Sequence, residues 1–342
     1  MELKAALEQL LNHHELHAEQ MESVMHKLMS GKATAAQIGA ILTAMRMKGE
    51  TLEEVTAAVQ VMRSLATPVP INDKTKLVDT CGTGGDGANT FNISTACAFV
   101  VAAAGGTVAK HGNRSISSKS GSADVLEAAG VDLTLTPEQV GECIDEVGVG
   151  FMFAPAHHSA MKHVIGARKE MGVRTIFNML GPLTNPAGAP FQVVGVYDKA
   201  LTVLFAKVLQ RLGSKHVMVV HAADGLDEIS IASKTYVAEL KDGAVTQWEL
   251  DPSDYDMDHA NLADLAVDSA QDSLNIIRAV FSNNDSAAKD IVCLNAGASL
   301  YVAGLAKDYA TGVQLARKVI ADGLAQQKLN QFIEKTQSFN KA

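Results

Sequence analysis

The sequence predicts two domains, a small all-helical N-terminal domain and a larger α/β domain whose central, mostly parallel sheet is flanked by helices. Three observations lead to this fold class. The first 66 residues repeat helical stripes of apolar side chains, prolines at positions 68 and 70 interrupt that pattern, and short apolar strands then alternate with helices. We therefore expect residues 1–70 to form the helical domain and residues 71–342 the α/β domain.

The helical domain is predicted from the spacing of its apolar residues. They recur at i, i+3, i+4 and i+7 in the stretches 21–28, 38–45 and 55–62, which places each set on one face of a helix. Thr34 and Thr51 each stand three residues before a Gln or Glu, a pattern typical of capping boxes at helix starts. We interpret this part of the chain as a packing or dimerisation module.

The α/β domain is predicted from strands that alternate with helices. Strands are expected at residues 76–80, 107–110, 191–196, 216–220 and 236–240. Helices are expected at residues 92–105, 199–212, 273–282, 287–304 and 310–327. Further helices are expected around residues 161–180, where they would complete the helical domain. The glycine and prolines at 181–182 and 185–186 then indicate a hinge between the domains.

Composition excludes several classes of protein. The 342 residues are 47% hydrophobic and 20% charged, an ordinary balance for a globular protein. The net charge of -9 argues against nucleic acid as a partner. No apolar stretch approaches the roughly 18 residues that a membrane helix needs, and no signal peptide is expected. The four cysteines lack metal-binding spacing, which indicates reduced thiols and a cytoplasmic location.

A cluster of glycines follows the first predicted strand, where residues 79–87 read DTCGTGGDG. Glycines allow positive φ and let a ligand approach backbone amides, and the helix that follows presents free N–H groups to an anion. The cluster matches the G-x-G-x-x-G dinucleotide fingerprint, but the acid expected about 20 residues later is replaced by basic residues. The loop also lacks the Gly-Lys-Ser/Thr ending that is typical of nucleoside triphosphatases. The loop predicts a phosphate site that binds neither NAD nor ATP, with a plain tight turn as the alternative.

A basic loop follows the next predicted strand. Residues 110–122 combine lysines, an arginine and five serines around two glycines. Cations supply charge and hydroxyls supply directed donors, as a ligand with several phosphates requires. Because α/β proteins bind ligands at the carboxyl ends of their strands, we expect this loop to converge with the glycine loop. A solvated surface turn is the alternative interpretation.

Two adjacent carboxylates, Asp227 and Glu228, follow the predicted strand at 216–220. Magnesium typically binds through one or two carboxylates together with substrate phosphates. An Asp-Glu pair in a loop usually only faces solvent. The two candidate phosphate loops are what favour a metal-binding role for this pair. Together the three segments predict a magnesium-assisted phosphate site.

Six segments together resemble the anthranilate phosphoribosyltransferase family: 81–86 (CGTGGD), 90–95 (TFNIST), 110–114 (KHGNR), 121–126 (GSADVL), 174–182 (RTIFNMLGP) and 227–228 (DE). They occur in the family's order, and the resemblance covers nearly the whole chain. It implies an active site at the hinge between the domains and a homodimer formed through the helical domain. It also implies transfer of the phosphoribosyl group of 5-phosphoribosyl 1-pyrophosphate (PRPP) to the amino group of anthranilate, with pyrophosphate leaving and inversion at C1.

The resemblance further implies a set of ligand contacts. PRPP would be held by Gly82, Gly85, Asp86, Thr90, Asn92, Ile93, Ser94, Thr95, Lys110, His111, Gly112, Asn113, Arg114, Ser115, Ile116, Ser117, Ser118 and Ser122. Anthranilate would contact Gly82, Asn113 and Arg168, with Arg168 pairing with its carboxylate, while His111, His158 and Pro182 would line its entry path. Ser94, Asp227 and Glu228 match the magnesium positions, and we expect two ions with the pyrophosphate. No catalytic nucleophile is expected, because an aromatic amine is already neutral at pH 7.

Two other functions compete with this interpretation. A pyrimidine nucleoside phosphorylase shares the two-domain architecture, but the full 110–114 string and the adjacent carboxylates favour the transferase. A non-catalytic nucleic-acid-binding relative of the fold would have a basic surface and a degraded metal site. The net charge and the intact motifs argue against that second alternative.

Overall fold

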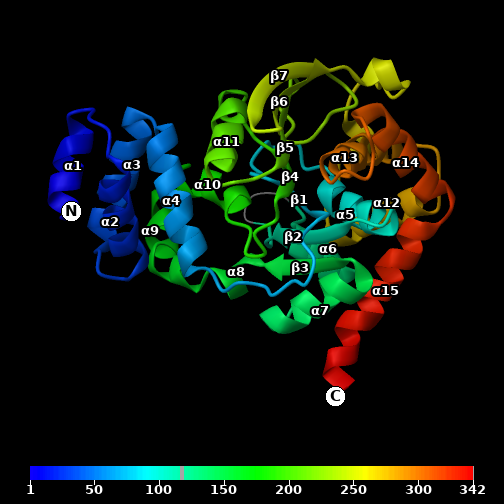
Figure 1. Cartoon of the computed structure of the whole chain (residues 1–342), viewed down its shortest axis with the longest axis horizontal. Coiled ribbons are helices and arrows are strands. Elements are labelled where there is room, and N and C mark those ends of the chain that lie inside the picture. The colour runs from blue at the N-terminus through cyan, green and yellow to red at the C-terminus, as the bar shows by residue number, and fades with distance from the viewer. Residues whose placement is uncertain (116–118, 342) are drawn as a thin grey trace.

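Four helices at the N-terminus form one end of the molecule (Figure 1). The structure is a computed structural model that describes residues 1–115 and 119–341. The four helices are α1 (Leu3–Leu11), α2 (Ala18–Met29), α3 (Ala35–Lys48) and α4 (Leu52–Leu65). The predicted capping boxes are confirmed, because the Thr34 hydroxyl accepts from the Gln37 amide at 3.2 Å and Thr51 accepts from Glu54 at 3.3 Å.

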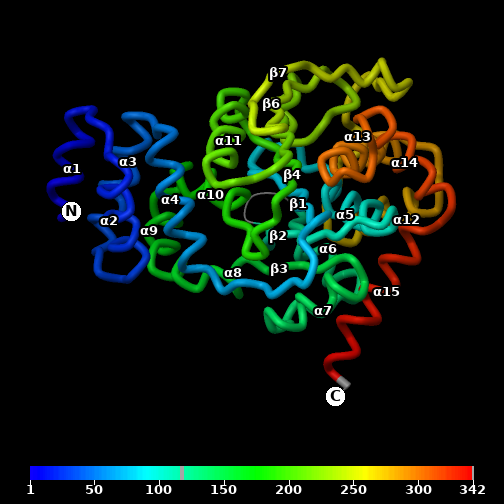
Figure 2. Tube along the Cα trace, viewed as in Figure 1, coloured from blue at the N-terminus to red at the C-terminus, as the bar shows by residue number. Residues whose placement is uncertain are grey.

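The chain returns to these helices between two strands of the sheet (Figure 2). The returning elements are α8 (Ala154–His157), η1 (Ser159–His163), α9 (Ile165–Met171), α10 (Phe177–Leu180) and η2 (Gly181–Leu183). Val164, Ala167, Ile176 and Phe177 belong to the same buried apolar core as the side chains of α1–α4. The helical part of the molecule is therefore assembled from two separate stretches of the sequence.

A seven-stranded sheet in the order β3-β2-β1-β4-β5-β6-β7 forms the centre of the α/β domain. The strands are β1 (Leu77–Gly82), β2 (Thr107–Gly112), β3 (Val149–Phe153), β4 (Phe191–Gly195), β5 (His216–Ala222), β6 (Thr235–Lys241) and β7 (Ala244–Leu250). The pairs from β3 to β5 are parallel, whereas β6 and β7 pair antiparallel. The chain builds outward from β1 in both directions, which places a topological switch point between β1 and β4.

Helices cover both faces of this sheet. On one face lie α5 (Ile93–Ala103), α6 (Ser122–Ala128), α12 (Ala270–Phe281), α13 (Ala287–Val302), α14 (Tyr309–Ala321) and α15 (Leu324–Ser338), which share one apolar core with the strands. On the other face α11 (Ala200–Arg211) joins the sheet to the core of the N-terminal helices. The remaining elements are α7 (Pro137–Val147) beside β3, and η3 (Pro252–Tyr255), η4 (Ala263–Leu265) and η5 (Phe339–Lys341).

The structure confirms the predicted fold class and corrects three details. The helix predicted at 310–327 is two helices, α14 and α15, because Gly323 takes a left-handed conformation (φ 70°) that ends the helical pattern. Strands β3 and β7 were not predicted. Within the described ranges, no helix is long and apolar enough to cross a membrane.

Candidate active site

The glycine loop, defined here as residues 82–87, leaves the carboxyl end of β1. Gly84, Gly85 and Gly87 have φ values of 65°, 80° and 79°, a conformation that other residues adopt only with strain. The Thr83 amide donates to the Gly195 carbonyl at 2.9 Å, which ties the loop to the end of β4. The loop therefore stands at the switch point of the sheet, where α/β proteins bind ligands.

Asp227 packs directly under this loop. A Cβ atom on Gly82 would lie 2.5 Å from Asp227 Oδ2, and one on Gly195 would lie 1.5 Å from the Asp227 carbonyl oxygen. The Gly84 amide donates to Asp227 Oδ2 at 2.7 Å. Glycine is thus required at positions 82 and 195 because the loop that carries the two carboxylates approaches there too closely for any side chain.

Asn92 joins three segments at the start of α5. Its Oδ1 accepts from the Ser120 hydroxyl at 2.8 Å and from the Ser273 hydroxyl at 2.7 Å, and its Nδ2 donates to the Ser120 carbonyl at 3.2 Å. Ser273 lies on α12, far away in the sequence, and no local motif indicated this contact. The side chain of Asn92 holds the start of α5 against the end of the basic loop.

The other residues predicted around this helix start are also placed together. Ile93 and Thr95 are buried in the first turn of α5, while Thr90 forms an isolated bridge with Ala266. Within residues 1–115 and 119–341, Thr95 Oγ1 is a buried oxygen with no hydrogen-bond partner. An unsatisfied buried hydroxyl at a helix N-terminus fits a site that a ligand completes.

Lys110 on β2 contacts β1 and the start of α5. Its side chain is buried, and Nζ donates to the Thr80 carbonyl at 2.7 Å and to the Ser94 hydroxyl oxygen at 3.1 Å. The ammonium group therefore fixes the hydroxyl of Ser94 and brings a positive charge close to the Glu228 carboxylate.

The two adjacent carboxylates lie in an environment that disfavours their charge. Burial raises the pKa of Asp227 above its usual range, and the nearby charge of Asp86 raises it further. Burial also raises the pKa of Glu228, and the charge of Asp227 adds to that effect, whereas Lys110 and a hydrogen bond from Ser94 lower it. Three carboxylates that repel one another beside a single lysine form a site whose charge a cation would balance.

The donor set fits magnesium that is shared with a substrate. Oxygen atoms of Ser94, Asp227 and Glu228 are the hard ligands that this ion prefers. In the described part of the chain, no three His, Cys, Asp or Glu side chains are grouped to hold a metal by themselves. Magnesium at this site would thus need further ligands from water or from substrate phosphates.

The basic loop begins with a close contact between β2 and α6. A Cβ atom on Gly112 would lie 2.2 Å from the Ser122 hydroxyl oxygen, so glycine is required there. The Ser122 hydroxyl donates to the Asn113 carbonyl at 3.3 Å, and the Ser115 amide donates to Asp124 at 3.0 Å. Ile116, Ser117 and Ser118 lie outside the described residues.

The guanidinium of Arg114 pairs with acidic side chains of α6. Its guanidinium donates to Glu127 through both terminal nitrogens at 2.7 and 3.0 Å, and to Asp124 at 3.1 Å. Both acids lie on α6, and the guanidinium also stands 5.7 Å from the centre of the Phe153 ring. The structure thus pairs the guanidinium of Arg114 with two acidic side chains of α6.

Two buried histidines lie together where the anthranilate path was predicted. The rings of His111, on β2, and His158, after α8, have centres 5.1 Å apart. Burial lowers the pKa of His111 to about 3 and that of His158 to about 4, so both are neutral at pH 7. The Nε2 atom of each is buried without a hydrogen-bond partner in the ranges described. Pro182 is also buried, and its carbonyl accepts from Gln192 at 3.1 Å.

Arg168 supplies a cation on α9, in the helical part of the molecule. Its guanidinium stands 5.3 Å from the centre of the Phe177 ring, and burial lowers its pKa. No carboxylate pairs with it among residues 1–115 and 119–341. A half-buried guanidinium beside an aromatic ring suits a planar aromatic carboxylate.

The two domains define a class of protein. Residues 4–66 match the family described as "Glycosyl transferase family, helical bundle domain", and residues 74–326 match "Glycosyl transferase family, a/b domain". A helical bundle followed by an α/β domain is thus the architecture of this glycosyl transferase class.

Relatives identify the member of that class. The chain is 72% identical over 339 residues to anthranilate phosphoribosyltransferase of Hydrogenovibrio crunogenus, covering 99% of this chain and 100% of the relative. The crystal structure of anthranilate phosphoribosyltransferase (TrpD) from Thermus thermophilus matches with a TM-score of 0.91 at 39% identity, covering 97% of this chain and 99% of that one. The Saccharomyces cerevisiae enzyme in complex with PRPP and Mg matches with a TM-score of 0.89 at 25% identity, covering 98% of each chain.

The chain belongs to the anthranilate phosphoribosyltransferase family, and its activity is that transfer reaction in tryptophan biosynthesis. The predicted function is confirmed, and the two alternatives, a pyrimidine nucleoside phosphorylase and a nucleic-acid-binding relative, are set aside. The residues that perform the reaction in this chain remain to be assigned from its own geometry.

Proposed function

We propose that this chain binds PRPP against the glycine loop and the start of α5, and binds anthranilate beside Arg168 at the hinge. The main support for this position of PRPP is the packing of Asp227 against Gly82 and Gly195. It sets two adjacent carboxylates next to left-handed glycines and an α-helix N-terminus, the combination that a magnesium pyrophosphate requires. The guanidinium of Arg168, half-buried beside an aromatic ring, supports the position of the aromatic carboxylate.

Ser94, Asp227 and Glu228 would hold the magnesium, which when bound neutralises negative charge on the departing pyrophosphate. We propose two ions. Support comes from the three carboxylates Asp86, Asp227 and Glu228, whose mutual repulsion raises the pKa of Asp227 and Glu228. Lys110 is a positioning residue in this proposal, because its ammonium group fixes the Ser94 hydroxyl without facing the substrate.

The transfer needs positioning and charge stabilisation more than proton chemistry. The anthranilate nitrogen forms a bond to C1 of the ribose while the bond from C1 to the pyrophosphate oxygen breaks. The electron pair leaves with pyrophosphate, and the nitrogen gives up one proton. Amide groups in the first turn of α5 would stabilise the leaving anion. Because the amine is neutral at pH 7, the site requires no strong base, and the neutral His111 and His158 are suited to lining the path of an aromatic substrate.

Charge-neutral substitutions test this assignment. Asp227→Asn and Glu228→Gln keep the side-chain shape, and each should lower kcat/KM at physiological magnesium by about 100-fold, an effect of the size found when one charge-stabilising group is removed. The matched control is Asp254→Asn, which removes a carboxylate from an exposed residue of η3. The readout is the loss of anthranilate fluorescence with PRPP, titrated with magnesium. Unchanged kinetics in both variants would remove the pair from the metal role.

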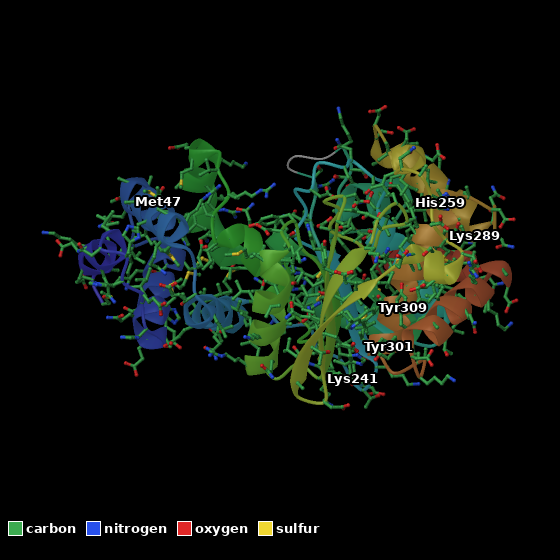
Figure 3. The ribbon with its side chains drawn as sticks, turned by 90° about the horizontal axis from the view of Figure 1, so that it is seen from above. Met47, Lys241, His259, Lys289, Tyr301 and Tyr309 are labelled. Atoms are coloured by element: carbon green, nitrogen blue, oxygen red, sulfur yellow. The ribbon has the colours of Figure 1, made fainter. Side chains whose placement is uncertain are left out.

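We also propose a homodimer formed through the helical domain. Leu11 at the end of α1 and Met47 near the end of α3 are 62% and 75% exposed, although α1 and α3 pack against each other. A hollow of about 290 Å³ beside Met47 is lined in part by Leu42, Met171 and Val173. Met47 and Val173, both exposed, line this same hollow, and exposed apolar side chains that lie together support an interface. Met47 lies toward one end of the molecule and His259 and Lys289 of the α/β domain lie toward the other (Figure 3), so the interface would leave that far end free.

We place the chain in the cytoplasm. Cys81, Cys97, Cys143 and Cys293 are free and buried. Such thiols support a reducing compartment.

A further inference from the structure

Arg174, which lies between α9 and α10, reaches the glycine loop. Its Nη2 donates to the Gly85 carbonyl at 2.6 Å, and a Cβ atom on Gly85 would lie only 3.5 Å from that nitrogen. The guanidinium also lies 4.2 Å from the centre of the Tyr197 ring. No sequence motif for phosphate binding includes this arginine, and the reaction described above gives it no role.

Both the backbone carbonyl and the guanidinium of Arg174 contact other residues. Arg46, on α3 of the helical domain, donates through its guanidinium to the Arg174 carbonyl. Tyr197, which stacks on the guanidinium, donates its own amide to the Thr83 hydroxyl at 3.0 Å. Arg174 therefore stands between the helical domain and the glycine loop, with contacts to both.

The contact with Gly85 decides which way one peptide group points. The Gly85 carbonyl and the Asp86 amide belong to the same planar peptide and point in opposite directions. Gly84 and Gly85 both have positive φ, so the loop has the conformational freedom to turn that peptide over. A hydrogen bond from a guanidinium to the carbonyl is charge-assisted and strong, and it holds the amide of Asp86 facing away from Arg174. The loop is then fixed at two successive residues, at Gly84 by Asp227 and at Gly85 by Arg174.

We propose that Arg174 is a positioning residue for PRPP binding, which holds the Gly85–Asp86 peptide in the orientation that presents the loop to the pyrophosphate. This inference rests on the proposed placement of PRPP at the glycine loop. Arg174 does not need to touch the substrate in this role. Its effect should fall on the affinity for PRPP and spare the anthranilate side of the site.

Steady-state kinetics on the full-length protein test the role. Arg174→Ala should raise the KM for PRPP by about tenfold, the size of one charge-assisted hydrogen bond, with kcat and the KM for anthranilate changed less than about twofold. Millimolar guanidinium should restore part of the loss, whereas methylammonium should not, because only a planar fork reproduces both contacts. The matched control is Lys169→Ala, which removes an exposed cation nearby in the sequence, on α9.

Two further variants keep the test decisive. If Arg174→Ala does not fold, Arg174→Lys and Tyr197→Leu replace it, and each should raise the KM for PRPP in the same direction by a smaller factor. An unchanged KM for PRPP while Asp227→Asn still loses activity would overturn the role of Arg174 and leave the PRPP site standing. Unchanged kinetics in Arg174→Ala and Asp227→Asn together would overturn both placements. A lowered melting temperature with no selective change in the KM for PRPP would show a merely structural role and overturn the proposal.

Discussion

Residues that look alike in the sequence serve different purposes in this site. Lys110 and Arg114 are both cations, and both belong to the same predicted phosphate loop. Lys110 is buried under Ser94, and Arg114 is paired with Glu127. Both placements depend on partners from other strands or helices, so spacing along the chain could not reveal them. The glycines at 82 and 195 show the same dependence, because only the folded chain brings Asp227 against them.

The buried pair His111 and His158 makes the stability of the protein depend on pH. The pKa of His158 falls to about 4 from its ordinary 6.5, mainly through burial and then through the charge of His157. A lowered folded-state pKa means that unfolding takes up protons between those two values. This contribution to stability is therefore complete above pH 6.5 and is lost as the pH falls toward 4.

His158→Gln removes one of these groups and should flatten that dependence. Between about pH 7 and pH 4.5 the unchanged protein should lose up to about 3 kcal/mol more of unfolding free energy than the variant, because each pKa unit corresponds to about 1.4 kcal/mol. Thermal or urea denaturation across this range gives the readout. His14→Gln, at an exposed position after α1, is the control and should follow the original curve. Parallel curves for His158→Gln and the unchanged protein would contradict the prediction.

At the scale of elements, the predictable features were those whose signal is local. Capping boxes, amphipathic stripes and the strand before the glycine loop all carry their pattern within about a dozen residues. β7 was missed because most of its residues are exposed or half-buried at the sheet edge, and no apolar run marks it. The adjoining turn did carry a signal, since Asp242 and Gly243 have φ values of 50° and 77° in a hairpin turn typical of Asp-Gly. The contacts that were missed, those of Ser273 and Arg174, act across long sequence separations, although Arg174 opens the 174–182 segment of the family resemblance.

Gly195→Ala tests how tightly two of these elements are packed. The new Cβ would fall 1.5 Å from the Asp227 carbonyl oxygen, so the segment after β5 must move away from β4. We expect a loss of about 1–3 kcal/mol in unfolding free energy, the usual cost of overpacking, together with a raised KM for PRPP. Gly166→Ala is the matched control, because that glycine lies in α9 with negative φ. A Cβ atom added there would have no atom within 4 Å outside the helix's own nearby backbone. Chemical denaturation should show that variant unchanged or slightly stabilised. A stable, fully active Gly195→Ala would contradict the packing argument.

At the scale of the whole molecule, the connections between the helical and α/β parts lie against each other. The Thr67 amide donates to the His157 carbonyl at 2.9 Å, and the side chain of Arg63 donates to the Leu183 carbonyl at 2.8 Å. The first connection runs from α4 to β1, and the others leave and re-enter the sheet around α8 and η2 (Figure 2). The prolines at 68 and 70 and the turns at 181–186 thus mark one region of the structure. The domain boundary at residue 70 stays a prediction.

The proposed dimer makes the last prediction, which concerns the outer surface of the helical domain. Met47→Glu places a charge at an exposed apolar position of α3, and a charge that must be desolvated opposes association. Light scattering at micromolar concentration should report a dimer for the unchanged protein and a monomer for Met47→Glu. Leu324→Glu is the control, since Leu324 is 37% exposed on α15 in the α/β domain, and it should remain dimeric. A monomer in every case, or a dimer that Leu324→Glu alone dissociates, would contradict an interface on the helical domain.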